Sequence, residues 1–142
     1  MKWVKVTLLL YTEDGALVRR PALAPLKVRK GDRRLELGKT KWETTRISLG
    51  QARLRSRRDP DADVEASEKF ERDIVAAFRS ATAWLTQRPA AAFAALRANA
   101  IEMEVLIDFE MSEVQMELEF PPEFLQCLGE RGLRLHVISN DF

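Results

Sequence analysis

The sequence predicts an α+β domain, with a single antiparallel sheet of about five or six strands and helices packed mainly on one face. Apolar and polar residues alternate near both ends of the chain, which is the period of a half-buried strand. The middle carries apolar residues three and four positions apart, which is typical of an amphipathic helix. The chain has 142 residues, so we expect residues 1–142 to fold as one domain.

The first strand is predicted over Lys2–Thr12. Val4, Val6 and Leu8 alternate onto one face, and the opposite face is half apolar, which predicts a central strand covered on both sides. Pro21 and Pro25 exclude a long helix after it, because each proline removes a backbone donor. We therefore expect a short turn or irregular structure over residues 17–26.

Two short strands are predicted at Arg33–Leu37 and Lys41–Leu49, the second of them rich in good strand formers. The polar stretch Gln51–Asp63 follows and is expected to be a surface loop. A long helix is predicted over Val64–Gln87, with Asp61 or Asp63 as its cap. Its apolar stripe consists of Phe70, Ile74, Phe78, Ala81 and Leu85.

A short second helix is expected to start at Pro89, since proline is tolerated in the first turn. Alternating apolar residues then predict a hairpin of two strands, Ile101–Glu110 and Val114–Phe120. A last helix from Pro121 and a final strand over Leu133–Val137 complete the order β, β, β, α, α, β, β, α, β.

Composition limits the class of protein. Hydrophobic residues make up 46% and charged residues 32% of the chain, as in ordinary globular proteins. The single cysteine, Cys127, excludes an internal disulfide and favours a reducing compartment. The apolar run Val6–Tyr11 is too short for a secretory signal, and no uncharged stretch reaches the roughly 18 residues of a membrane span. We expect a cytoplasmic protein with no membrane association.

Charge is distributed unevenly along the chain. Residues 1–60 carry 16 Lys or Arg and 6 Asp or Glu, whereas residues 61–142 carry 7 and 16. Either the two halves neutralise each other within one sheet, or the basic half offers a surface to an acidic partner.

Acidic residues on the predicted hairpin are the first candidate site. If the hairpin forms, these side chains share one sheet face, and like charges opposite one another destabilise a sheet. Basic side chains of the same chain could cover them, or a basic partner could dock there. A metal site is the third reading, although the loop spacing of a calcium site is missing. The residues are Glu102, Glu104, Asp108, Glu110, Glu117 and Glu119.

A basic run is the second candidate site, formed by Arg53, Arg55, Arg57 and Arg58. It could bind phosphate or a partner, or it could be a solvated loop that nearby aspartates neutralise in part. Nucleic-acid binding would require a basic stripe continuous from Arg29 to Arg58, and no aromatic platform accompanies these charges.

The sequence gives little support for a catalytic site. Cys127 lies on the last predicted helix beside apolar residues, which favours a buried small side chain over a nucleophile. His136, the only histidine, points away from Leu135 and Val137 by strand alternation. We therefore assign no catalytic, cofactor or metal residues from the sequence.

Several motifs in order resemble an uncharacterised bacterial family, domain of unknown function 4279. The whole chain is covered, and the resemblance implies a helix after the first strand but no catalytic residues. Some small bacterial α+β proteins of this type act as immunity or partner-binding proteins. The matching segments are Leu23-Ala24-Pro25 with Lys30-Gly31-Asp32, Lys39–Leu49 with Trp42, Asp63–Leu96, and Phe120–Leu125 through Gly132-Leu133.

The leading hypothesis is a non-enzymatic protein-binding domain, immunity-like or self-associating, whose oppositely charged surfaces orient a partner. The alternatives are a small metal-dependent enzyme that uses the acidic face and a nucleic-acid-binding domain that uses the basic half.

Overall fold

The computed structural model describes residues 2–14, 16–29, 32, 34–37, 44–55, 63–110 and 117–140. The α+β class is confirmed, and none of the described helices is long and apolar enough to cross a bilayer. The strands are β1 (Trp3–Thr12), β2 (Leu35–Leu37), β3 (Thr45–Arg53), β4 (Ile101–Glu110) and β5 (Arg134–Ser139). The helices are the 3-10 helix η1 (Arg20–Leu26) and the α-helices α1 (Val64–Thr86), α2 (Ala90–Ala98) and α3 (Pro122–Glu130).

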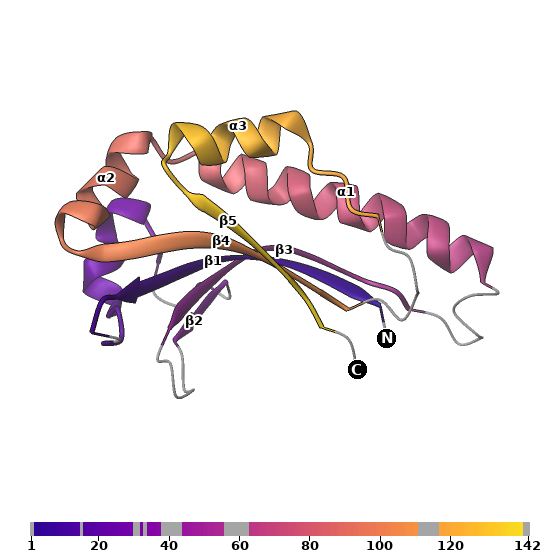
Figure 1. Cartoon of the computed structure of the whole chain (residues 1–142), viewed down its shortest axis with the longest axis horizontal. Coiled ribbons are helices and arrows are strands. Elements are labelled where there is room, and N and C mark those ends of the chain that lie inside the picture. Colours follow the sequence, from indigo (N-terminus) through magenta and orange to yellow (C-terminus); the bar gives the residue numbers. More distant parts are fainter. Residues whose placement is uncertain are drawn as a thin grey trace.

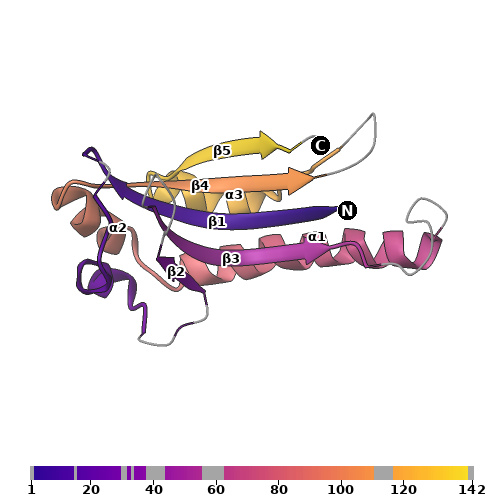
Figure 2. The same ribbon diagram turned by 90° about the horizontal axis from the view of Figure 1, so that it is seen from below.

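The described strands form one sheet in the order β2-β3-β1-β4-β5 (Figure 2). β1 is antiparallel to both of its neighbours, whereas β5 runs parallel to β4. The prediction of a purely antiparallel sheet is therefore wrong at this edge. Parallel neighbours require a crossover connection, and α3 lies in the connection between β4 and β5.

The predicted strand over Val114–Phe120 is wrong in the part that the structure describes. Residues 117–120 are not in a strand, and residues 111–116 lie outside the described residues. β4 already pairs with β1 on one side and β5 on the other, so neither edge of β4 is free to pair with a further hairpin strand. The apolar alternation has another cause, because Leu118 and Phe120 pack on the core from the connection to α3. The Phe120 ring meets Phe78 edge-on, with centroids 5.7 Å apart.

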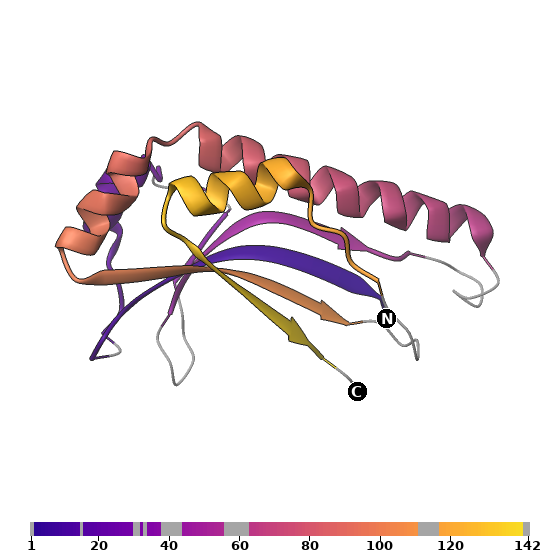
Figure 3. The ribbon, with the colours of Figure 1, turned by 45° about the horizontal axis from the view of Figure 1, so that its top comes forward.

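One face of the sheet is covered by α1 and α3, which lie side by side above it (Figures 1 and 3). The helix predicted over Val64–Gln87 is confirmed as α1, and its Asp63 cap accepts a hydrogen bond from the Ala66 amide at 3.0 Å. Val6 of β1 and Ile107 of β4 are partners in register and both are fully buried. The two ends of the chain therefore share one core, as predicted.

Close packing of α1 on β3 depends on Gly50. The pairing of β3 with β1 shifts register next to this residue, which marks a β-bulge. A Cβ atom built on Gly50 would lie 2.4 Å from the Ala77 carbonyl oxygen of α1. The Ser80 hydroxyl of α1 also donates to the Leu49 carbonyl at 2.9 Å. The helix thus rests directly on the strand backbone.

One end of the fold is closed by η1 and α2, which lie together in Figure 1. The expectation of irregular structure over residues 17–26 is corrected by η1, a seven-residue 3-10 helix with Pro21 in its first turn and Pro25 inside it. A 3-10 turn forms fewer backbone hydrogen bonds than an α-helix, so the missing proline donors cost less. Leu23 and Leu26 are fully buried and hold η1 in place.

Beneath the sheet, no described helix covers the second face (Figure 1). β1 is central as predicted, but the expectation that it is covered on both sides is wrong. β3 also differs from its predicted range, since it begins at Thr45 and continues to Arg53. Residues 51–53, predicted as loop, therefore present side chains on the sheet.

Candidate functional site

The uncovered side of the sheet is the main candidate site, and we refer to it as the open face. Strand alternation places every second residue of each strand there, because the intervening residues point into the core. The register aligns these side chains in rows across the sheet, such as Arg46, Leu9 and Glu104. The described open-face residues are Trp3, Lys5, Thr7, Leu9, Tyr11, Glu36, Arg46, Ser48, Gln51, Arg53, Glu102, Glu104, Leu106, Asp108, Glu110, Arg134, His136 and Ile138.

Charge on the open face changes sign from strand to strand. β3 contributes Arg46 and Arg53, whereas β4 contributes four carboxylates between Glu102 and Glu110. Lys5 of β1 is directly opposite Asp108, and Arg134 of β5 is directly opposite Glu104. Basic residues on both neighbouring strands thus flank the acidic strand, and each opposite pair contributes about 0.2–1 kcal/mol to sheet stability.

Apolar side chains lie near the middle of the open face, and the aromatic side chains of Trp3 and Tyr11 lie toward the two ends of β1. Leu9 and Leu106 are each only 8% exposed, although no described helix covers them. Trp3 donates a hydrogen bond from Nε1 to the Glu110 carboxylate at 2.6 Å, and Lys5 Nζ lies 5.0 Å from the centre of its ring. An apolar centre with a charged surround is the usual anatomy of a protein–protein interface.

Tyr11 extends this centre toward the acidic residues of β4. Burial raises the pKa of the Tyr11 hydroxyl above its ordinary value of 10.0, and the charge of Glu104 and a hydrogen bond with Glu102 raise it further. The neutral hydroxyl is therefore favoured beside these carboxylates, where it acts as a donor.

Cys127 and His136 do not form a catalytic pair. Cys127 is buried, its thiol donates to the Phe124 carbonyl at 3.1 Å, and burial raises the pKa of the thiol. His136 instead lies on the open face, with Nδ1 at 3.5 Å from the Glu104 carboxylate. A nucleophilic thiol needs a lowered pKa and a base within reach.

The acidic residues predicted as a site are separated by the structure. Glu102, Glu104 and Asp108 lie together on the open face, as the alternation of β4 requires. The expectation that Glu117 and Glu119 share this face is wrong, because both are exposed in the connection to α3 and belong to no strand. Among the side chains that the structure describes, no group of three or more His, Cys, Asp or Glu is arranged to hold a metal ion.

The basic residues predicted as a site are only partly described. Arg53 ends β3, and together with Arg55 it borders a shallow hollow of about 170 Å³ beside Lys69 and Asp73 of α1. Arg57 and Arg58 lie outside the described residues.

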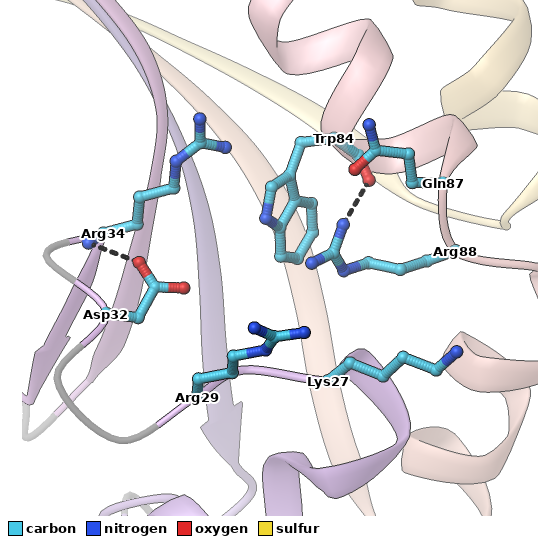
Figure 4. A pocket seen from close by; sticks show the side chains of 7 residues that line it. All are labelled: Lys27, Arg29, Asp32, Arg34, Trp84, Gln87 and Arg88. Carbon is cyan, nitrogen blue, oxygen red and sulfur yellow. Dashed lines mark hydrogen bonds between the residues drawn. The ribbon is translucent and has the colours of Figure 1, made fainter.

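Sequence reasoning missed a basic pocket at the C-terminal end of α1 (Figure 4). Its volume is about 390 Å³. Lys27, Arg29 and Arg34 belong to one basic stretch of the sequence, but Arg88 lies more than fifty positions away, so the sequence does not show that these four residues meet. The sequence signals were the excess of basic residues in the first half of the chain and the basic stripe considered from Arg29 to Arg58. The lining residues are Lys27, Arg29, Asp32, Arg34, Trp84, Gln87 and Arg88.

Comparisons with protein-family models, with curated proteins and with solved structures found no match to this chain. The resemblance to domain of unknown function 4279 therefore stays a prediction.

Proposed function

We propose that this chain is a non-enzymatic protein-binding domain that uses its open face, and that the occupant of this face is a second copy of the chain. One observation carries the proposal: Arg46 and Arg53 of β3 have charges opposite to those of the aligned Glu104 and Glu110 of β4, whereas Lys5 of β1 would face Lys5 of the other copy. On one side of β1 lie basic β3 and then acidic Glu36 of β2, and on the other lie acidic β4 and then basic β5.

A twofold axis along β1, between two facing copies, would bring unlike charges together. Arg46 and Glu104 both align with Leu9, so Arg46 of one copy would face Glu104 of the other. Glu36 aligns with Arg46 and Arg134 aligns with Glu104, so these two residues would meet in the same way. A twofold interface repeats each contact, which doubles the effect of each pair. Opposite charges would align best near the centre of the interface, because the strands of two facing sheets cross at about 30°.

The size of the open face is sufficient for a specific dimer. At about 3.3 Å per residue and about 4.8 Å between strands, strands of these lengths cover about 600 Å² in each copy. Two copies would then bury about 1,200 Å², at the lower limit of the usual size for specific complexes. We therefore expect a weak, salt-sensitive dimer in which Leu9 lies nearer the centre and Trp3 and Tyr11 lie toward the two ends of β1.

The test uses two charge-reversal variants, Arg46→Glu and Glu104→Arg, in sedimentation velocity at low salt. Each variant alone would place like charges opposite each other twice, so association should weaken about a hundredfold. Mixed in equal amounts, the two variants should recover association, because each mutated residue then faces its opposite. Recovery on mixing is the signature of a twofold interface.

Matched controls reverse charges on the exposed side of α1, with Arg79→Glu and Glu71→Arg. These controls should associate like the unaltered chain. If Glu104→Arg lowers the melting temperature strongly, the exposed pair Glu36→Arg and Arg134→Glu repeats the design at the margins of the face. A monomeric unaltered chain at low salt, or reversal variants that associate normally, would show that a second copy does not occupy the open face.

A further inference from the structure

The basic pocket lies outside the open face and has the volume of a small-molecule site. About 390 Å³ falls within the usual range of roughly 300–1,000 Å³ for ligand pockets. In Figure 4, Arg29 reaches toward Arg88 from the segment after η1, and Asp32 and Arg34 lie across from Trp84. Four cationic side chains and a single carboxylate therefore line one cavity.

Arg88 is held in a fixed position in the wall of this pocket. Its Nε donates to the Leu26 carbonyl at 2.7 Å, and Nη1 donates to the Trp84 carbonyl at 2.8 Å. Its guanidinium also stacks on the Trp84 ring, 3.6 Å from the ring centre. A guanidinium positioned by three contacts loses little entropy when it binds an anion.

Among the described residues, the cations of the pocket form no ion pair, because none of these Lys and Arg side chains lies within ion-pair distance of a carboxylate. Asp32 uses Oδ1 to accept the Arg34 backbone amide at 3.0 Å. Burial lowers the pKa of Arg88, the positive charge of Arg34 lowers it further, and Asp32 opposes the shift. The positive charges thus act on one another, and a bound anion would relieve this repulsion.

We propose that the pocket binds a compact phosphorylated ligand through a diphosphate group. Phosphate oxygens match the paired donors of Arg side chains, which makes arginine the preferred residue for this recognition. One phosphate monoester carries a charge of about −1.5 to −2, so two linked phosphates balance the four cations better than one. This inference does not depend on the proposed dimer.

An extended nucleic acid fits these residues less well than a small ligand. The other described basic cluster, Arg53 and Arg55, lies beside Lys69 near the opposite end of α1. Lys69 and Trp84 are about 22 Å apart along the helix, at about 1.5 Å per residue. A nucleic-acid site needs a basic stripe that follows the phosphate backbone, whereas here four basic residues line one pocket.

The test is isothermal titration of the full chain with inorganic pyrophosphate at low ionic strength. The variant Arg29→Gln/Arg34→Gln removes two charges from the pocket and spares the fold, because neither side chain forms a hydrogen bond in the described structure. We expect binding to weaken about a hundredfold, at about tenfold for each lost charge-assisted contact. The matched control Arg72→Gln/Arg79→Gln makes the same charge change at exposed positions of α1, outside the pocket and the open face, and should bind like the unaltered chain.

Three further ligands define what is recognised. Adenosine diphosphate distinguishes a nucleotide from free diphosphate as the source of the group, and sulfate tests whether any anion suffices. Adenosine itself should not bind. No binding of pyrophosphate at millimolar concentration, equal loss in both double variants, or sulfate binding as tight as pyrophosphate would overturn the proposal.

Discussion

Replacing Gly50 with alanine should disrupt the contact that holds α1 on the sheet. The new Cβ would lie 2.4 Å from the Ala77 carbonyl oxygen and 2.9 Å from the Ala77 Cα. Both atoms belong to helix backbone and cannot rotate away. Ordinary contact begins near 3.4 Å, so the helix would have to move about 1 Å away from β3.

The expected loss of folding free energy depends on the side chains that this face of α1 buries. Phe70, Phe78 and Leu85 of α1 are at most 5% exposed and pack in the common core. A gap of about 1 Å removes a quarter to a half of the contact energy of a packed surface. Burial of one such side chain contributes about 1.5–3 kcal/mol, so a partial loss over three of them amounts to about 2–4 kcal/mol.

Urea unfolding followed by tryptophan fluorescence measures this loss, with Gly129→Ala as the matched control. Gly129 lies in α3, and a Cβ there would meet nothing within 4 Å. Alanine at this position should stabilise the protein by about 0.5–1 kcal/mol, because it favours the helix. A Gly50→Ala protein within about 0.5 kcal/mol of the unaltered chain would refute the reasoning, since that is the range of neutral surface changes.

Two further predictions concern buried polar contacts. Arg131 is 7% exposed, and its Nε donates to the Leu85 and Arg88 carbonyls at 2.8 and 3.0 Å. Arg131→Met should therefore lower the free energy of unfolding by about 3 kcal/mol in urea titration, and a near-neutral result would contradict it. Tyr11, the only tyrosine, has a raised pKa, so folding stability should fall as pH rises above 10.0. Glu104→Gln should lower the Tyr11 titration midpoint in ultraviolet absorbance, and an unchanged midpoint would contradict the assigned cause.

Local patterning predicted the elements that pack one face on the core. The stripe through Phe70 and Leu85 placed α1 within one residue of its observed end, and the alternation around Val6 and Ile107 placed β1 and β4. These patterns work because burial repeats with the period of the element itself. They do not identify which strands are neighbours, so the parallel pairing of β5 was missed. They also confuse a strand with any extended segment that buries alternate residues, as Phe120 shows.

The pocket depends on long-range packing and was beyond such reasoning. Arg88 reaches the carbonyl of Leu26, 62 positions earlier in the chain, and this contact exists only after η1 packs beside α2. The prolines of η1 led to a prediction of irregular structure, although a 3-10 helix accommodates them. Lys27 and Arg29 are as close in sequence as Arg53 and Arg55, so what the sequence could not show is that Arg88 joins the first group. Adjacency in sequence favours detection of charge clusters on one strand or loop over clusters that the fold assembles.

In the proposed dimer, the same open-face side chains would stabilise one copy and attract a second, and the two effects differ in their dependence on salt. Lys5 opposite Asp108 and Arg134 opposite Glu104 already compensate the acidic strand within one chain, at the short distances of neighbouring strands. Such contacts lie within the screening length of about 8 Å at physiological salt, so the stability of one copy should depend only weakly on salt. Association of two copies would instead depend on attraction between the charged strands of one copy and those of the other. Added salt should screen this attraction more strongly. Glu36 opposite Arg46 is compensated within one chain in the same way, so strand charges alone do not distinguish the two roles, and the salt dependence of association is the measurement that does.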